Sequence, residues 1–542
     1  MRTITRWLIA TISAFTAAGT AYADVKLADV IQAGRRDAAR KMIASGARVN
    51  EAQADGTTPL DWAVYNLDID LVKALIARGA DPNITNNFGS NPLAEAARAG
   101  NLTLVKILLD AHANVNAANA DGQTALMLAA RTGVVDIARL LVRHGADVNA
   151  REHWRGQTAL MWAAAEDHPQ ITRYLISRGA AVNVRSTNND WLDRSSQITS
   201  EPRAQYRPAG GLTPLLYAIR GDCLGCVQAL VMGGADVNMP TPMGITPLIS
   251  ALDNFRFDIA KYLLERGANP RTRDWWGRTP LYVAIDMHSF VLPHSGTGLE
   301  PPGDRKAALD IAKMLLAAGA DPNPQLNMHR PGRGGTTGRF TDDTLTTGAT
   351  PLLCAAISHD NEALTLLLSY GAVVDLPNVM GVTPLMAAAG MGVQGGGTGV
   401  TLPDPHGNYA GDVQSRVLST LGLLLRAGAD VNARVTDTSS WTARSGRLST
   451  MTKRQGQTAL YGAIQWGWTR VVQYLLAHGA KGDVSDAEGV TPLEAAKAAG
   501  GGRDPELIKA IVAMIDKANE NSPAGSKRPE TVGKIVPASA VL

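Results

Sequence analysis

Hydrophobic and polar positions along the chain repeat with a period of 33 residues. Each period opens with Thr-Pro-Leu or a close variant, which begins at Thr58, Asn91, Thr124, Thr158, Thr213, Thr246, Thr279, Thr350, Thr383, Thr458 and Thr491. Successive copies stand 33 or 34 residues apart, except for three gaps of 55, 71 and 75 residues. A fixed period of this length predicts a solenoid, in which each unit packs against its neighbours.

Each period predicts two helices and a turn. The threonine can cap the first helix, and proline is tolerated at the first helical position because its missing N–H would have no partner there. An apolar stripe at helical spacing, such as Val72, Leu75 and Ile76, predicts the second helix. The glycine that follows, as at Gly79, favours a left-handed helix end, and the polar stretch after it predicts the turn of a hairpin.

This arrangement resembles the ankyrin repeat over residues 24–517. The resemblance implies an all-α ankyrin-repeat solenoid of about twelve helix–turn–helix units with β-hairpin fingers. The first unit, residues 25–50, lacks Thr-Pro-Leu and is expected to cap the stack. At the other end Glu494, Lys497 and Lys517 give the last unit a polar face, which also suits a cap.

The three longer gaps predict loop insertions. These are expected at residues 184–210, 287–305, 324–347, 391–414 and 433–454. Loops of this length without structure of their own are usually functional or disordered. The glycine-rich run at residues 390–399 lacks the Lys-Ser/Thr pair of a phosphate-binding loop, so it is interpreted as a connector and not as a nucleotide site.

The two ends of the chain predict processing and disorder. Residues 1–23 have the layout of a signal peptide, with Arg2 and Arg6 ahead of an apolar run and a small-x-small site that ends at Ala23. Cleavage there predicts a periplasmic or secreted protein. The apolar run is shorter than the roughly 20 residues that a membrane span needs, so no span is expected in the mature chain. Residues 518–542 are expected to form a disordered tail.

Composition and the absence of motifs narrow the function classes. The chain is 45% hydrophobic but only 5% aromatic and contains 54 glycines, which suits a thin stacked structure. A formal net charge of +3 gives no overall electrostatic case for nucleic acid. The sequence contains none of the common catalytic motifs, and its 10 histidines lack metal-ligand spacing. We therefore expect a monomeric non-enzyme without cofactor or metal.

Two of the 3 cysteines form a Cys-x-x-Cys pair, Cys223 and Cys226. The pair lies at the predicted start of a second helix, where thiol pKa values are lowered. Cys226 takes the position of Ile137 and Ile259 in other units, so it is expected to be buried. The pair is interpreted as structural, bonded or not, and a thiol–disulfide redox role is the alternative.

Aromatic and basic residues mark the candidate binding surface. In ankyrin repeats this surface is usually concave and combines the finger tips with the exposed end of each first helix. The resemblance therefore indicates the finger-tip residues Trp154, Arg155, Trp275 and Trp276 and the helix-end residues Tyr65, Arg131, Arg220 and Trp466. Tryptophan is unusual at a solvated turn and is enriched in interface hot spots. Packing under the insertions is the alternative for the finger-tip tryptophans, whereas Trp62 and Trp162 are interpreted as core.

These observations favour a non-catalytic scaffold that binds a protein partner outside the cytoplasm. The first alternative is a redox factor that uses Cys223 and Cys226. The second is recognition of an envelope glycan, since tryptophan faces next to arginine suit sugars and anions. The sequence does not name the partner, because one repeat fold serves unrelated targets.

Overall fold

The structure is a computed structural model that describes residues 26–189, 209–289, 305–327, 344–391, 413–437, 454–498 and 505–520. The expected signal peptide and most of the five expected insertions lie outside these ranges. The chain divides into two compact bodies, an N-terminal part (Met1–Ala181) and a C-terminal part (Val182–Leu542).

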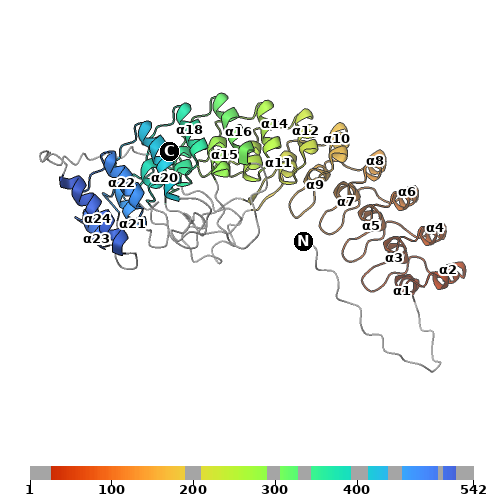
Figure 1. Cartoon of the computed structure of the whole chain (residues 1–542). Helices are drawn as coiled ribbons and strands as arrows, with labels where there is room; N and C mark the ends of the chain where they lie inside the picture. The colour runs from red at the N-terminus through yellow and green to blue at the C-terminus, as the bar shows by residue number, and fades with distance from the viewer. Residues whose placement is uncertain are drawn as a thin grey trace, which may run out of the picture. The chain divides into compact units, whose positions relative to one another are not determined.

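The N-terminal part is built from pairs of short helices. These are α1 (Leu27–Gln32), α2 (Arg36–Ala44), α3 (Pro59–Tyr65), α4 (Ile69–Ala77), α5 (Pro92–Arg98), α6 (Leu102–Asp110), α7 (Ala125–Thr132), α8 (Val135–Arg143), α9 (Ala159–Ala165) and α10 (Pro169–Ser177). The odd-numbered helices pack on one another in one row and the even-numbered helices in a second row (Figure 1). The core lies between the two rows.

The C-terminal part continues the same pattern. Its helices are α11 (Pro214–Arg220), α12 (Leu224–Met232), α13 (Pro247–Asp253), α14 (Phe257–Glu265), α15 (Pro280–His288), α16 (Arg305–Ala317), α17 (Pro351–Ile357), α18 (Asn361–Ser369), α19 (Pro384–Ala388), α20 (Val413–Arg426), α21 (Ala459–Trp466), α22 (Thr469–Ala477), α23 (Pro492–Ala498) and α24 (Pro505–Glu520). Helix α24 runs past residue 518, where the tail is expected to begin. None of the described helices is long and apolar enough to cross a membrane.

The helix starts follow from the Thr-Pro-Leu motif. Thr58 caps α3, because its side chain accepts the backbone N–H of Asp61 at 3.2 Å while the carboxylate of Asp61 accepts the N–H of Thr58 at 2.9 Å. Leu60 of the motif is buried, as is Leu75 of the second helix. Gly79 follows with a φ of 82°, the left-handed helix end that the sequence predicts.

The fingers are tight turns with little regular strand pairing. In the first finger the N–H of Gln53 donates to the carbonyl of Thr57 at 2.9 Å, and the N–H of Asn87 in the next finger donates to Asp55 at 2.8 Å. Within the described ranges, the one sheet is the antiparallel pair β1 (Asn188–Asn189) and β2 (Ala209–Gly210). The predicted fold class, an all-α repeat solenoid, is confirmed.

A ladder of asparagine side chains joins successive repeats after their second helices. Asn50 shows the pattern: its Nδ2 donates to the carbonyl of Gly79 at 3.0 Å, and its Oδ1 accepts the N–H of Asp81 at 2.8 Å. The same two bonds are made to the next repeat by Asn83, Asn116, Asn149, Asn183, Asn238, Asn323 and Asn432. Each such rung satisfies two backbone groups at a repeat boundary.

Candidate functional site

The ends of the first helices are open in the N-terminal part. Tyr65, Arg98 and Arg131 occupy the same position in α3, α5 and α7, and all three are exposed, Tyr65 at 58%. Trp62, one turn before Tyr65, meets it edge to face with ring centres 5.6 Å apart. Arg131 lies over the ring of Trp162 with its guanidinium carbon 5.3 Å from the ring centre, a cation–π distance.

Trp62 and Trp162 are not core residues, and the interpretation from the sequence is wrong for both. Each is partly exposed. The indole N–H of Trp62 donates to the side chain of Gln53 at 2.7 Å, and that of Trp162 donates to Gln157 at 3.1 Å. Because the partner is a finger residue in both repeats, these tryptophans lie where the first helix meets its finger and contribute to the open surface.

Trp154 and Arg155 are exposed at a finger tip, as expected, and Trp154 is 75% exposed. The carboxylate of the buried Glu152 accepts the backbone N–H groups of Trp154, Arg155 and Gln157 at 2.6, 2.8 and 2.9 Å. A charged acceptor that binds three N–H groups fixes the turn. The structure therefore presents the Trp154 ring to solvent from a firmly held backbone.

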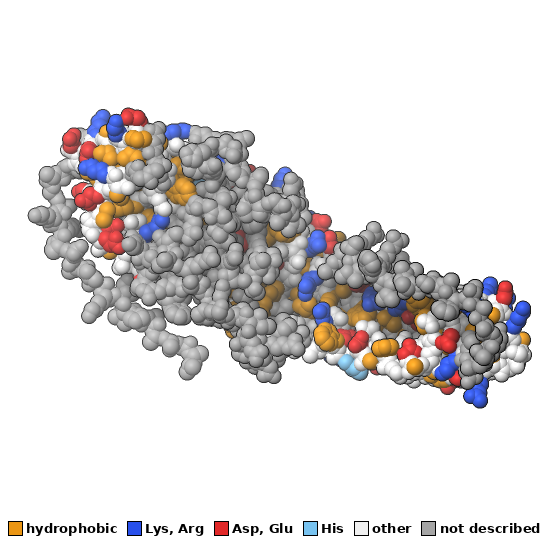
Figure 2. Space-filling model, turned by 90° about the horizontal axis from the view of Figure 1, so that it is seen from below, with side chains coloured by type: hydrophobic (Ala, Val, Ile, Leu, Met, Phe, Trp, Pro, Cys, Tyr) orange, Lys and Arg blue, Asp and Glu red, His pale blue; other side chains and the backbone are white. Residues whose placement is uncertain are grey.

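One exposed aromatic residue escaped the sequence analysis. Phe88 is 69% exposed and precedes Gly89 in the second finger, where its N–H donates to the side chain of Asn86 at 3.0 Å. Its place directly before the finger glycine, the place that Arg155 holds before Gly156, is the sequence signal for it. We name the set Trp62, Tyr65, Phe88, Arg131, Trp154 and Trp162 the aromatic surface. Figure 2 shows hydrophobic and charged side chains interspersed on the N-terminal part.

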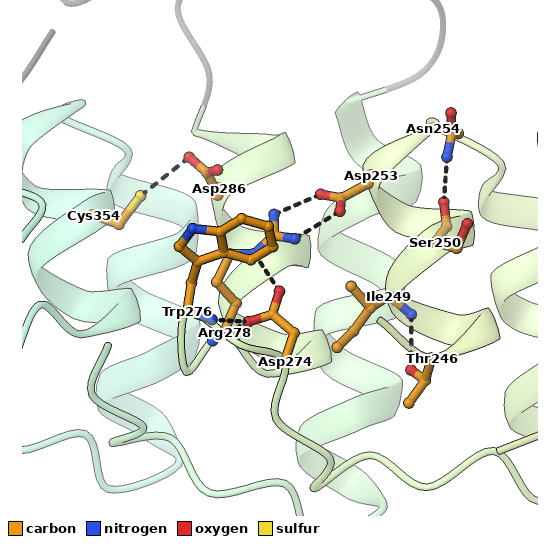
Figure 3. A network of polar contacts seen from close by, with 10 residues as sticks. All are labelled: Thr246, Ile249, Ser250, Asp253, Asn254, Asp274, Trp276, Arg278, Asp286 and Cys354. Carbon is orange, nitrogen blue, oxygen red and sulfur yellow. Dashed lines mark hydrogen bonds and ion pairs between the residues drawn. The ribbon is translucent and has the colours of Figure 1, made fainter. Parts of the chain in front are cut away.

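In the C-terminal part the two finger tryptophans behave differently. Trp275 is 45% exposed, whereas Trp276 is only 5% exposed. The expectation that both present a face to solvent is therefore wrong for Trp276. Its ring lies beside Arg278, whose guanidinium carbon is 5.2 Å from the ring centre (Figure 3).

Arg278 connects this finger to the end of α13. Its Nη1 and Nη2 donate to the two carboxylate oxygens of Asp253, both at 2.8 Å, and its Nε donates to Asp274 at 2.7 Å (Figure 3). Asp274 also accepts the backbone N–H groups of Trp276 and Arg278. Burial disfavours the charged guanidinium, but the carboxylates of Asp253 and Asp274 outweigh this effect and raise the pKa of Arg278. The guanidinium bonds to both carboxylates, which fits a structural role.

The helix-end position is buried in two repeats of the C-terminal part. Arg220 in α11 is exposed, as expected. The equivalent residues in α15 and α17 are Asp286 and Ile357, and both are buried. Asp286 accepts a hydrogen bond from the thiol of Cys354 at 3.6 Å (Figure 3). The exposed helix ends of the C-terminal part are therefore interrupted at α15 and α17.

Trp466 is half-buried at the end of α21. Its indole N–H donates to the carbonyl of Gly390 at 3.0 Å, and its ring stacks on Trp468 with ring centres 5.7 Å apart. A Cβ atom on Gly390 would lie 2.4 Å from Cδ1 of Trp466, so only glycine fits beneath the indole. Trp466 therefore packs on its own chain through much of its surface.

Cys223 and Cys226 are joined by a disulfide. Cys223 is the N-cap of α12, and its Sγ accepts the N–H of Cys226 at 2.9 Å, as the carboxylate of Asp68 accepts the N–H of Leu71 at the start of α4. Both cysteines are buried, as the sequence predicts for Cys226. Burial restricts the access of an attacking thiolate to the two sulfurs.

The eight predicted binding residues differ in their exposure. Tyr65, Arg131, Trp154 and Arg155 are exposed in the N-terminal part, and Arg220 and Trp275 are exposed in the C-terminal part. Trp276 and Trp466 make internal contacts. Whether any of them binds a partner stays a prediction.

Comparison with known proteins agrees with the repeat architecture. Models described as ankyrin repeats match residues 27–76, 63–152, 93–188, 196–274, 215–293 and 455–487. No curated protein matches the chain. Since the matched segments together cover more than half of the sequence, and since they coincide with the helix pairs and fingers seen in the structure, the chain belongs to the ankyrin-repeat family.

Proposed function

We propose that this protein is a non-catalytic scaffold that binds a protein partner on the aromatic surface of its N-terminal part. Ankyrin repeats indicate a protein–protein interaction scaffold. The observation that carries the choice of surface is the exposure of Tyr65, Phe88 and Trp154, at 58%, 69% and 75%. Large aromatic residues lose little conformational entropy on binding and dominate interface energetics. Their exposure on the N-terminal part therefore supports a binding surface there.

The fixed geometry of these side chains supports the proposal. Glu152 holds the turn that carries Trp154, and two finger glutamines hold the indoles of Trp62 and Trp162. A surface that is ordered before binding loses less conformational entropy when the partner binds. Arg131, stacked on Trp162, adds a guanidinium that can bind a carboxylate of the partner while it keeps its aromatic contact.

The proposed location is the periplasm or the extracellular space. The signal-peptide layout of residues 1–23 supports export. The Cys223–Cys226 disulfide supports it as well, because disulfides persist mainly in oxidising compartments. The test is fractionation of cells that produce the chain, with N-terminal sequencing of the product. A chain that starts at Asp24 in the exported fraction is expected, and an uncut chain in the cytoplasm would overturn the location.

Binding is tested by affinity capture from envelope extract with the tagged chain. We expect the triple variant Tyr65→Ala, Phe88→Ala, Trp154→Ala to lose a partner that the parent chain captures. Met232→Ala is the control, because Met232 is also a large exposed residue, at 82%, but lies outside the aromatic surface. Both variants should have the same midpoint of urea unfolding as the parent chain. Capture of the same proteins by parent and triple variant would exclude the aromatic surface as the contact.

The same tagged chain distinguishes two alternative functions, glycan binding and thiol–disulfide exchange. Capture of an envelope glycan in place of a protein, with the same dependence on Trp154, would change the partner class and keep the surface. A redox role would require Cys223 and Cys226 to exchange with a partner disulfide in the folded chain. Their burial disfavours this role, and thiol labelling of the folded, mildly reduced chain tests it.

A further inference from the structure

Asp375 occupies the place of an asparagine in the ladder that joins the repeats. It stands in the segment Gly371–Asp375, which matches Gly319–Asn323 and Gly428–Asn432 position by position. Its Oδ2 accepts the backbone N–H of Asp430 in the next repeat at 2.9 Å. This bond corresponds to the one that Oδ1 of Asn323 accepts from Val373 at 2.7 Å. One half of the rung is therefore formed as elsewhere.

The other half of this rung lacks its donor. Nδ2 of Asn323 donates to the carbonyl of Gly371 at 3.3 Å, and the carbonyl at the corresponding place after Asp375 is that of Gly428. Oδ1 of Asp375 is buried and has no hydrogen-bond partner. Within the described part of the chain, no side chain donates to the Gly428 carbonyl either. An unpaired buried acceptor is destabilising, so a carboxylate in this place opposes the junction.

We propose that Asp375 is a proton-operated rung of the ladder: the neutral carboxyl donates its O–H to the Gly428 carbonyl and closes the junction between the α17–α18 and α19–α20 repeats, whereas the ionised carboxyl leaves it weakened. The added proton supplies the donor that Nδ2 supplies in the asparagine rungs. The asparagine rungs therefore stay closed at any pH, and this rung closes only when it is protonated.

The charges around Asp375 favour its neutral form. Burial raises the pKa of the Asp375 carboxyl, and the negative charge of Asp430 in the next repeat raises it further, against the lowering effect of the Asp430 N–H bond. Among described residues, no lysine, arginine or histidine lies within ion-pair distance of it. The rungs on either side, Asn323 and Asn432, are uncharged.

The sign of the pH effect follows from the raised pKa. A carboxyl with a folded pKa above its ordinary value of 3.8 stabilises the fold fully below that value and loses the contribution as pH rises through the folded pKa. The junction should therefore be tighter in acid. Each unit by which the fold raises the pKa of Asp375 corresponds to a tenfold change in the opening equilibrium.

The test compares hydrogen exchange of the full chain and its Asp375→Asn variant at pH 3.8 and pH 8, read on the segment at residues 413–437. The ratio of the two exchange rates at one pH cancels the intrinsic pH dependence of exchange. We expect the Asn variant to exchange about tenfold more slowly than the parent at pH 8, because its rung is always closed, and the ratio to shrink toward one at the lower pH. A ratio that is equal at the two pH values, or larger at the lower pH, would overturn the proposal.

The reciprocal variant is Asn323→Asp, which places a carboxyl in a rung that is closed in the parent. Its exchange on the segment after Gly371 should match the parent more closely at pH 3.8 than at pH 8. If this variant exchanges like the parent at both pH values, a carboxyl does not open a rung when it ionises, and the proposal fails. Neither residue belongs to the aromatic surface, so the outcome is independent of the proposed partner binding.

Discussion

The guanidinium carbon of Arg278 lies 5.2 Å from the centre of the Trp276 ring, while the same guanidinium binds Asp253 with two hydrogen bonds. Asp253 is the last residue of α13, and Trp276 belongs to the following finger. One side chain thus joins a helix end to a finger tip and covers the tryptophan between them. The contact covers part of Trp276, which is buried, whereas its neighbour Trp275 is exposed.

Replacing Arg278 by methionine should destabilise the C-terminal part by about 3–5 kcal/mol, because the change leaves the carboxylates of Asp253 and Asp274 without their cation. The measurement is urea unfolding at pH 7, followed by circular dichroism. Arg266→Met is the control: Arg266 lies 5.0 Å from the ring centre of Tyr262 but is exposed, so its loss should cost about 1 kcal/mol or less. Equal losses would mean that the Arg278 network contributes no more than a surface contact.

The adjacent tryptophans form a second matched pair. Trp276→Ala should lower the free energy of unfolding by about 3–5 kcal/mol, because it empties a buried site. Trp275→Ala should lower it by less than about 1 kcal/mol, because much of that ring already faces solvent. The same urea titration distinguishes them. A larger loss for Trp275 would show that the exposed residue is the one that supports the finger.

Much of the fold could be predicted because its signals are local. The cap at Thr58 and the left-handed end at Gly79 each depend on a few neighbouring residues, and both are confirmed. The 33-residue period adds the packing of one repeat on the next. Repeat geometry also gave correct positions for the exposed residues Tyr65 and Trp154, since register alone places them at a helix end and a finger tip.

The direction of the side chains could not be predicted in the same way, because it depends on residues far away in the sequence. The Trp276 ring contacts Arg278, and Arg278 also binds Asp253, which lies 25 residues before Arg278 in the sequence. Trp62 shares its repeat position with Cys354, yet the first is partly exposed and the second is buried. What lies over a helix decides this difference, and the pattern within one repeat does not contain it.

Gly390 offers a test of how firmly Trp466 is held. Gly390→Ala should destabilise the fold by more than Gly267→Ala, although both glycines have a φ close to 90°. At Gly267 nothing lies within 4 Å of the new Cβ, so only the backbone strain of about 1 kcal/mol is added. At Gly390 the Cβ meets the Trp466 indole in addition. Equal thermal shifts for the two variants would indicate that the indole moves aside freely and is available to a partner.

The Cys223–Cys226 disulfide should contribute about 2 kcal/mol, a small amount for a disulfide because the loop that it closes is short. Reduction of the parent should lower its thermal midpoint accordingly. The double variant Cys223→Asp, Cys226→Val gives α12 the kind of carboxylate cap that Asp68 provides for α4, together with a buried aliphatic residue, so it should fold without any response to reductant. An unfolded double variant would show that the bond itself, and not its cap and core positions, is required.

Asp61 predicts a pH dependence in the N-terminal part. Burial raises the pKa of its carboxyl to about 6, against the hydrogen bonds from Thr58, while Asp55 and Glu95 add to the rise. A raised pKa means that the stabilisation is complete below the ordinary value of 3.8 and is lost as pH rises through about 6. Asp61→Asn keeps an oxygen for the N–H of Thr58 but cannot ionise. Its stability relative to the parent should therefore increase as pH rises, by about 1.4 kcal/mol for each unit of pKa shift. Hydrogen exchange of α3 in both chains at pH 4 and pH 8 measures the difference, and a gap that does not widen with pH would show that burial does not hold the proton on Asp61.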